Sequence, residues 1–101
     1  MPAYMIVTAH VRDRDRFIAD YGRPAAELIG RFGGRYLVRA PGAELLEGDQ
    51  GHGASVVVSE WPSKDAARAF WDSPEYQELK RRREGLADVQ VLLIEAPALG
   101  S

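Results

Sequence analysis

The chain has 101 residues and a formal net charge of −2 at pH 7. This length fits one domain, and the slightly acidic balance argues against a general nucleic-acid-binding protein, which would normally be basic. The absence of cysteine excludes disulfides, thiolate nucleophiles and thiolate metal sites. No apolar run is long enough to span a bilayer, and no signal segment precedes the first predicted strand. We therefore expect a cytoplasmic protein with no membrane or nucleic-acid partner.

The first predicted element is a strand over residues 3–11, where β-forming side chains predominate. Side chains alternate between the two faces of a strand. One face is uniformly apolar and should pack on helices, whereas the other face mixes apolar and polar groups and should contact something else. The apolar face is Met5, Val7, Ala9 and Val11, and the mixed face is Tyr4, Ile6, Thr8 and His10.

Asp13 or Asp15 can cap the next helix, whose apolar stripe at helical spacing extends over residues 17–32. Gly22 and Pro24 interrupt the stripe, and a proline inside a helix removes a backbone hydrogen bond. We therefore expect a kink, or two helical pieces that meet near Gly22 and Arg23. The glycine pair at 33–34 should end the helix.

Two further strands are predicted over residues 35–40 and 54–61. Between them we expect a short strand over residues 44–47 and a glycine-rich loop over residues 48–53. The second of the two longer strands contains three consecutive valines, 56–58, so it should be buried on both faces.

Two capping serines, Ser63 and Ser73, each predict the start of a helix. Tyr76, Leu79 and Arg83 would lie along one side of the second helix. The basic run at 80–83 as a whole is typical of a solvated helix face.

A last strand is predicted over residues 89–95, so that residues 1–96 form one domain and residues 97–101 a loose tail. The element order fits an α+β fold of the ferredoxin-like, split βαβ type, with an antiparallel sheet and two main helices on one face. The other face of the sheet would then be uncovered. A symmetric homodimer, in which two sheets pack face to face, is the simplest way to cover it.

Several short motifs in this order resemble the domain-of-unknown-function family 1330, and the similarity extends over residues 1–96. The resemblance implies a dimeric α+β barrel. Members of that wider superfamily use the barrel interior as a small-molecule pocket, and they include monooxygenases, muconolactone isomerases and haem-degrading enzymes. The glycine-rich loop departs from many relatives. The motifs are Pro2-Ala3-Tyr4, Gly33-Gly34-Arg35-Tyr36-Leu37-Val38-Arg39, Leu46-Glu47-Gly48, Pro62-Ser63, Ala66-Ala67-Arg68-Ala69 and Asp72-Ser73-Pro74-Glu75-Tyr76-Gln77.

His10 and Glu60 are the candidate catalytic residues. On the mixed face of the first strand, His10 would point into the barrel and act as a base near neutral pH; alternatively it is hydrogen-bonded or solvent-facing at a strand end. Glu60 ends a strand that we expect to be buried. Its carboxyl would have a raised pKa suited to proton transfer, or it would pair with an arginine.

Candidate ligand-binding residues come from the strand–helix junctions. Arg35 and Arg39 lie on one strand and are expected to share a face, where they would hold a carboxylate or enolate; alternatively they pair with nearby glutamates. The aromatic residues would wall a pocket or else belong to the core or dimer interface. Ser73 would help to bind an anion at a helix N-terminus or simply cap that helix. The aromatic candidates are Tyr36, Trp61, Trp71 and Tyr76.

Two functions are therefore predicted as alternatives. The first is an enzyme, without a bound metal or cofactor, that isomerises or oxygenates a small acidic or conjugated molecule. The second is a non-catalytic small-molecule-binding or dimeric interaction module. The first requires an open cavity lined by polar groups, and the second is compatible with a filled interior.

Overall fold

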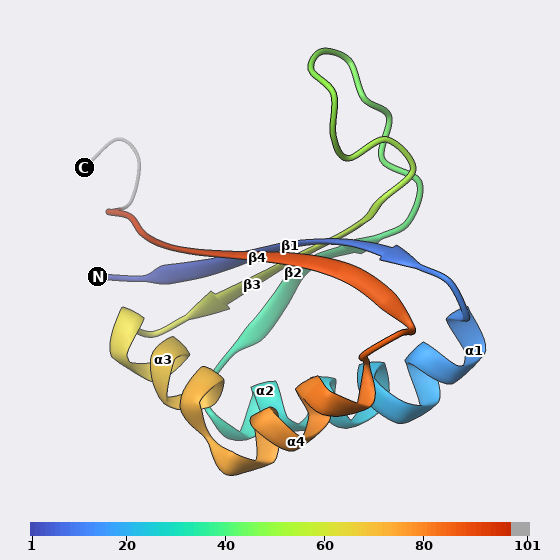
Figure 1. The fold of residues 1–101 in the computed structure, drawn as a ribbon. Helices are drawn as coiled ribbons and strands as arrows, with labels where there is room; N and C mark the ends of the chain where they lie inside the picture. The colour runs from blue at the N-terminus through green and yellow to red at the C-terminus, as the bar shows by residue number, and fades with distance from the viewer. Residues whose placement is uncertain (98–101) are drawn as a thin grey trace.

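The computed structural model describes residues 1–97, which form a four-stranded antiparallel sheet with all helices on one face (Figure 1). The strand order is β2-β3-β1-β4. This topology confirms the predicted ferredoxin-like α+β fold. Of the predicted tail, residues 98–101 lie outside the described residues. The elements are β1 (Ala3–Val11), α1 (Arg14–Phe17), η1 (Ile18–Gly22), α2 (Arg23–Arg31), β2 (Arg35–Ala40), β3 (Ser55–Trp61), α3 (Lys64–Asp72), α4 (Pro74–Arg82) and β4 (Ala87–Glu95).

The first helical region consists of pieces, as Gly22 and Pro24 predict. A π-helical turn, η1, joins α1 to α2, and the amide of Arg23 donates to the carbonyl of Ile18, five residues earlier. Pro24 then falls in the first turn of α2, where its missing N–H costs little. The wider turn accommodates the proline without breaking the helical layer.

The end of α2 is fixed by two glycines with different roles. Gly33 has φ of 89°, the left-handed conformation that glycine adopts at low cost. Gly34 is required by space, because a Cβ atom there would lie 2.8 Å from the Ile29 side chain and 2.9 Å from the ring of Trp61. This close approach packs the start of β2 against the core.

The core lies between the sheet and the helices. The alternation predicted for β1 is confirmed, since Ala3, Met5 and Ala9 are buried against the helical layer. Trp61 of β3 and Tyr76 of α4 are the largest fully buried side chains. Their rings both pack on Phe70 of α3, with centroids 5.0 Å and 4.5 Å away.

Strand β2 contains an irregularity that the sequence pattern does not reveal. Its pairing with β3 shifts between Tyr36 and Val38, so Leu37 is an extra residue. An extra residue reverses the face that later side chains occupy. Arg35 pairs with Glu60 on the uncovered face, whereas Arg39 follows Tyr36 on the helix-covered face. The prediction that Arg35 and Arg39 share a face is therefore wrong.

Two other predictions about strands need correction. Residues 44–47 form no strand but belong to a long loop, residues 41–54, that rises from the sheet on the side away from the helices (Figure 1). The valines of β3, residues 56–58, are half-buried rather than buried on both faces, because no helix or strand within residues 1–97 covers the second face of the sheet.

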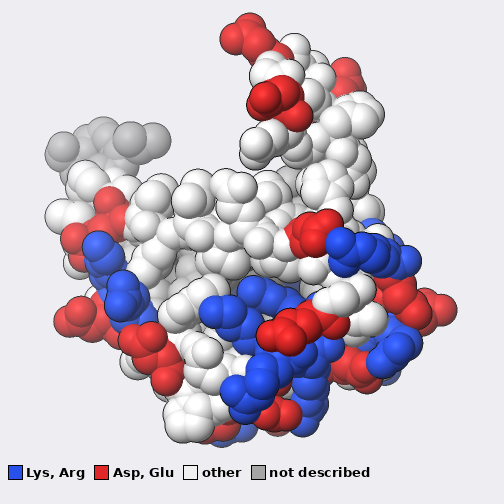
Figure 2. Space-filling view, viewed as in Figure 1, with Lys and Arg blue, Asp and Glu red and all other residues white. Residues whose placement is uncertain are grey.

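The uncovered face of the sheet is defined by Tyr4, Ile6, Thr8 and His10 of β1 and the side chains paired with them. It exposes large apolar groups: Val38 and Ile94 are each 44% exposed, and Leu92 is 51% exposed. Figure 2 shows this region as a largely uncharged band between the charged helical layer and the loop.

Candidate functional site

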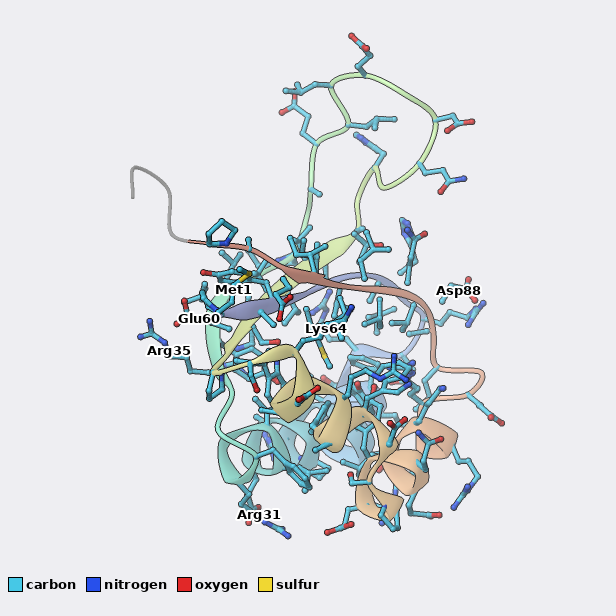
Figure 3. The ribbon with its side chains drawn as sticks, turned by 90° about the vertical axis from the view of Figure 1, so that its left-hand side faces the viewer. Met1, Arg31, Arg35, Glu60, Lys64 and Asp88 are labelled. Atoms are coloured by element: carbon cyan, nitrogen blue, oxygen red, sulfur yellow. The ribbon has the colours of Figure 1, made fainter. Side chains whose placement is uncertain are left out.

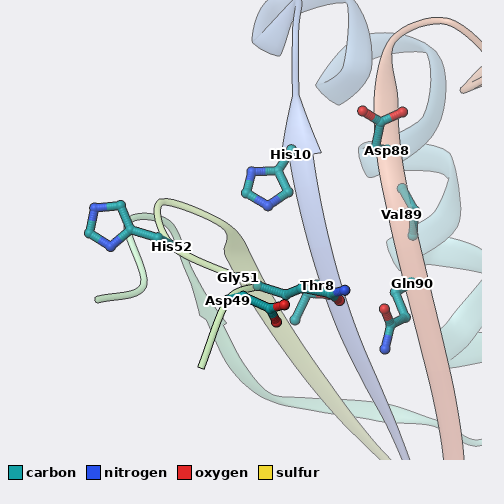
Figure 4. Close-up of a pocket in the computed structure, with 9 residues that line it drawn as sticks. Thr8, His10, Asp49, Gly51, His52, Asp88, Val89 and Gln90 are labelled. Carbon is teal, nitrogen blue, oxygen red and sulfur yellow. The ribbon is translucent and has the colours of Figure 1, made fainter. Parts of the chain in front are cut away.

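A hollow of about 630 Å³ lies between the uncovered face and the loop of residues 41–54 (Figure 4). Its size falls within the range of small-molecule sites, roughly 300–1,000 Å³. We call it the loop hollow. Two strands and the loop contribute its lining, which is Thr8 and His10 of β1, Asp88, Val89 and Gln90 of β4, and Asp49, Gln50, Gly51 and His52 of the loop.

The floor of the loop hollow follows from strand register. In the antiparallel pairing of β1 with β4, His10 lies opposite Asp88, and Thr8 lies opposite Gln90. Paired residues share a face of the sheet, so four polar side chains gather at one end of the uncovered face.

The wall of the loop hollow depends on glycines. Gly48, Gly51 and Gly53 have φ values of 106°, 96° and 79°, which other residues adopt rarely. The loop is also held by a hydrogen bond of 3.2 Å from the amide of Leu45 to Nδ1 of His52. Because Nδ1 accepts this bond, the neutral ring of His52 carries its proton on Nε2.

The charges around the hollow are unequal. Arg12 donates to both carboxylate oxygens of Asp88, each at 2.7 Å, and also to the carbonyl of Gly85 at 3.4 Å. None of the ion pairs within residues 1–97 involves Asp49. No lysine or arginine is among the residues that line the hollow.

The structure places His10, alone among the residues proposed from sequence, in the loop hollow. Its side chain is exposed and lies beside the loop (Figure 4). The sequence pattern did not select His52, Asp49, Asp88 or Gln90, which also line the hollow. The cross-strand pair of His10 with Asp88 was missed because the last strand was expected to begin at Val89, whereas β4 begins at Ala87.

Glu60 and Arg35 form a separate polar group at the opposite end of the sheet from Asp88 (Figure 3). Arg35 donates from Nε to Glu60 Oε1 at 2.8 Å, and the Tyr4 hydroxyl donates to Oε2 at 3.2 Å. The bond from Arg35 holds the pKa of the Glu60 carboxyl below its ordinary value. The raised pKa expected for Glu60 from sequence is therefore wrong, and the carboxylate is an ion-pair partner.

The aromatic candidates lie on the helix-covered face and mostly fill the core. Trp61 is 1% exposed and donates from Nε1 to the Ser59 hydroxyl at 3.0 Å. Tyr36 is half-buried beneath the guanidinium of Arg39, 4.6 Å from its ring centre. Trp71 lies beside a cavity of about 110 Å³, which is below the usual size of a ligand site.

The start of α4 is explained by capping. The hydroxyl of Ser73 accepts from the amide of Tyr76 at 3.1 Å and donates to the carbonyl of Phe70 at 2.7 Å. Ser73 is 6% exposed, so its position supports the capping alternative over an anion site.

The basic run on α4 is not uniformly solvated. Arg83 is 9% exposed and donates to the hydroxyls of Tyr21 at 3.0 Å and Tyr76 at 3.1 Å. Burial raises the pKa of the Tyr76 phenol, so this hydroxyl stays protonated. The general expectation of a solvated face is wrong for Arg83, whereas its expected position beside Tyr76 and Leu79 is confirmed.

Two absences can be stated for residues 1–97. No cluster of three or more His, Cys, Asp or Glu side chains in this part of the chain is arranged to hold a metal ion. No helix within the same residues is long and apolar enough to cross a membrane.

Solved structures share this fold at low sequence identity. A protein of unknown function from Rhodopseudomonas palustris is 22% identical, with a TM-score of 0.74, covering 96% of this chain and 83% of its own. SnoaB from Streptomyces nogalater, described as a cofactor-independent oxygenase, is 19% identical with a TM-score of 0.67. The match covers 99% of this chain and 98% of SnoaB. A dimeric ferredoxin-like protein of unknown function from Jannaschia sp. CCS1 is 13% identical with a TM-score of 0.69, covering 95% and 100%. These similarities show the fold.

Comparison with curated proteins gave no match. The family model named domain of unknown function DUF1330 matches residues 2–97. That match includes the whole sheet, the helical layer and every residue that lines the loop hollow. The chain belongs to the DUF1330 family.

Proposed function

We propose that this protein is a homodimeric enzyme that binds a small conjugated molecule in the loop hollow and uses His10 to transfer a proton. The observation that carries the proposal is the gathering of His10, His52 and Gln90 around an open hollow of ligand size. The fold brings these residues together from two strands and a loop that are distant in sequence.

The dimer part of the proposal rests on the uncovered face. Val38, Leu92 and Ile94 expose apolar surface there, and a contiguous apolar patch on a small domain marks an interaction site. A two-fold axis would place the same patch on both copies. The Jannaschia protein of similar fold is described as dimeric, which supports the same arrangement for this chain.

The chemical part rests on the position of His10. Histidine is the side chain whose ordinary titration lies nearest neutral pH, so a neutral imidazole here can accept a proton from an acidic C–H or O–H group. The electron pair left behind would be delocalised over the conjugated substrate, and its negative charge would be balanced by the imidazolium formed on His10. Return of the proton to another carbon would complete an isomerisation. Reaction of a CH₂ group with O₂, giving a carbonyl group and water, would complete an oxygenation. SnoaB, which has a similar fold, is described as a cofactor-independent oxygenase.

The alternative is a non-catalytic binding or interaction module. It is favoured by the helix-covered side of the sheet, where Trp61 and Tyr76 fill the interior. The two functions differ in one measurable property, because only an enzyme would accelerate proton transfer.

Hydrogen–deuterium exchange tests the proposal directly. A panel of phenols and conjugated ketones in D₂O would be followed by NMR with catalytic amounts of protein, after native mass spectrometry has established whether it is a dimer and whether it retains a small molecule. We expect exchange of at least one compound to be accelerated, and His10→Ala to abolish that acceleration. The control is Glu27→Gln on the exposed surface of α2. This variant should accelerate exchange of the compound as much as the unmodified protein does. Full activity of His10→Ala would rule out His10 as the base. If exchange is accelerated for none of the compounds, the binding module would be favoured.

A further inference from the structure

We infer that the loop hollow selects neutral or positively charged molecules rich in hydrogen-bond donors and disfavours anions. This inference rests on the proposed function, since it takes the loop hollow as the ligand site, but it concerns ligand charge rather than chemistry. It also departs from the carboxylate-holding role that the sequence predicts for Arg39, which the structure places on the other face of the sheet.

The lining of the hollow carries two carboxylates and no lysine or arginine side chain. Asp49 and Asp88 contribute carboxylates, and Gln90 and Thr8 add oxygen atoms that accept as well as groups that donate. Since no lysine or arginine of the same copy lines the hollow, an anion would find no positively charged side chain of that copy there to hold it. A ligand with N–H or O–H groups would make charge-assisted hydrogen bonds to the carboxylates.

The surroundings reinforce this charge. The loop of residues 41–54 contains Glu44, Glu47 and Asp49 and no lysine or arginine. Figure 2 shows acidic groups on the loop, whereas the basic groups in this view concentrate on the helical layer. Charges of one sign around a concave site raise the local concentration of the opposite sign.

Two arginines near this end of the sheet do not fully offset the negative charge of the hollow. Arg12 is engaged by both oxygens of Asp88 and by the carbonyl of Gly85. Arg14 donates to the hydroxyl of Ser55 at 3.3 Å, and Ser55 pairs with the buried residue Ala9 on the helix-covered face. Asp49 is therefore the carboxylate in the lining whose charge is least compensated.

Three probes of nearly identical shape separate charge from size. Benzamidinium, benzamide and benzoate carry charges of +1, 0 and −1 on the same ring. Each would be titrated into the full-length, ¹⁵N-labelled protein at pH 7.5 and low salt, with the backbone signals of His10, Gly51 and Gln90 as reporters of the hollow. We expect benzamidinium to bind most tightly and benzoate most weakly, with about tenfold between them for a single carboxylate at a few ångströms in water. Added salt should reduce that ratio.

Variants identify the source of the preference. Asp49→Asn should weaken the binding of benzamidinium several-fold and leave the binding of benzamide unchanged, because the substitution removes a charge with little change of shape. The matched control is Glu47→Gln, which removes the same charge from the same loop at a position outside the lining. It should alter benzamidinium binding much less than Asp49→Asn does.

The outcomes are separable. Benzoate binding at the hollow as tightly as benzamidinium would overturn the inference and leave the hollow standing as a ligand site. An equal effect of Glu47→Gln and Asp49→Asn would also overturn it, because the preference would then be a general property of an acidic loop. Shifts at none of the three reporters would overturn both the inference and the hollow as a small-molecule site. The expected order of binding without accelerated proton exchange would support the inference while removing only the catalytic role of His10.

Discussion

The two faces of the sheet differ in how deeply their polar side chains are buried. On the helix-covered face, each buried polar side chain has a partner, and no buried side-chain nitrogen or oxygen atom within residues 1–97 lacks a hydrogen bond. On the uncovered face, His10 and Gln90 are exposed beside an open hollow, and Leu92 is half-exposed. The difference indicates that one face stabilises the fold and that the other is available for binding.

The largest effect on folding is expected from the helix-covered face at Trp61. Replacing this fully buried ring in Trp61→Ala should lower the free energy of unfolding by about 3–5 kcal/mol, enough to unfold much of a domain of this size. Urea denaturation followed by circular dichroism would measure the change. Leu46→Ala on the loop is the control, since Leu46 is 87% exposed and its loss should cost little. A loss below about 1 kcal/mol for Trp61→Ala would contradict the dense packing around this ring.

A smaller effect is expected from Arg83 on the same face. Arg83→Met removes both hydrogen bonds to Tyr21 and Tyr76, and hydrogen bonds to a charged group contribute about 1.5–3 kcal/mol. The two phenols remain bonded to each other at 2.9 Å, which should keep the loss near 2 kcal/mol. Arg82→Met is the matched control, because Arg82 is the exposed neighbour in the same basic run. Equal losses for the two variants would show that burial of Arg83 has no energetic consequence.

Substitution on the uncovered face should change association rather than folding. Leu92→Asp places a charge in the proposed dimer interface twice, once from each copy, and burying an unpaired charge is costly. We expect a dimer at micromolar concentration to become a monomer with an unchanged circular dichroism spectrum. Light scattering after size-exclusion chromatography would measure the mass. Ile18→Asp on η1, which is 37% exposed, is the control for adding a charge elsewhere. A Leu92→Asp dimer as stable as the unmodified protein would exclude this face as the interface.

The side chains of β1 that face the helices could largely be predicted from the alternation of apolar and polar residues along the strand. The apolar side chains at odd positions from Ala3 to Ala9 are on the helix side, as expected. Helix boundaries could be predicted equally well, because serine caps and left-handed glycines fix a helix end through contacts with neighbouring residues. The burial of Arg83 could also have been predicted, since Tyr76, Leu79 and Arg83 recur at helical spacing and Tyr76 and Leu79 are buried.

The site was less predictable, and for identifiable reasons. The extra residue at Leu37 in β2 reverses the face of Arg39, and nothing in the local pattern announces it. The loop hollow joins Asp49 to His10 and Asp88, which are about forty residues away on either side in sequence. Only the strand register and the path of the loop bring them together.

The smallest predicted effect concerns Glu60, at the end of the uncovered face away from the hollow. Its pKa is below the ordinary value of 4.5 in the folded protein, first because of the hydrogen bond from Arg35. The unfolded chain therefore binds more protons than the folded chain between the two pKa values, so stability rises with pH across that window. The contribution of Glu60 is fully present above the unfolded pKa and is lost as the pH falls through the folded pKa. Urea unfolding of the unmodified protein and of Glu60→Gln should differ at pH 7 and converge on acidification below 4.5. A difference that stays constant down to acid pH would show that the amide substitution acts through packing and not through the ion pair with Arg35.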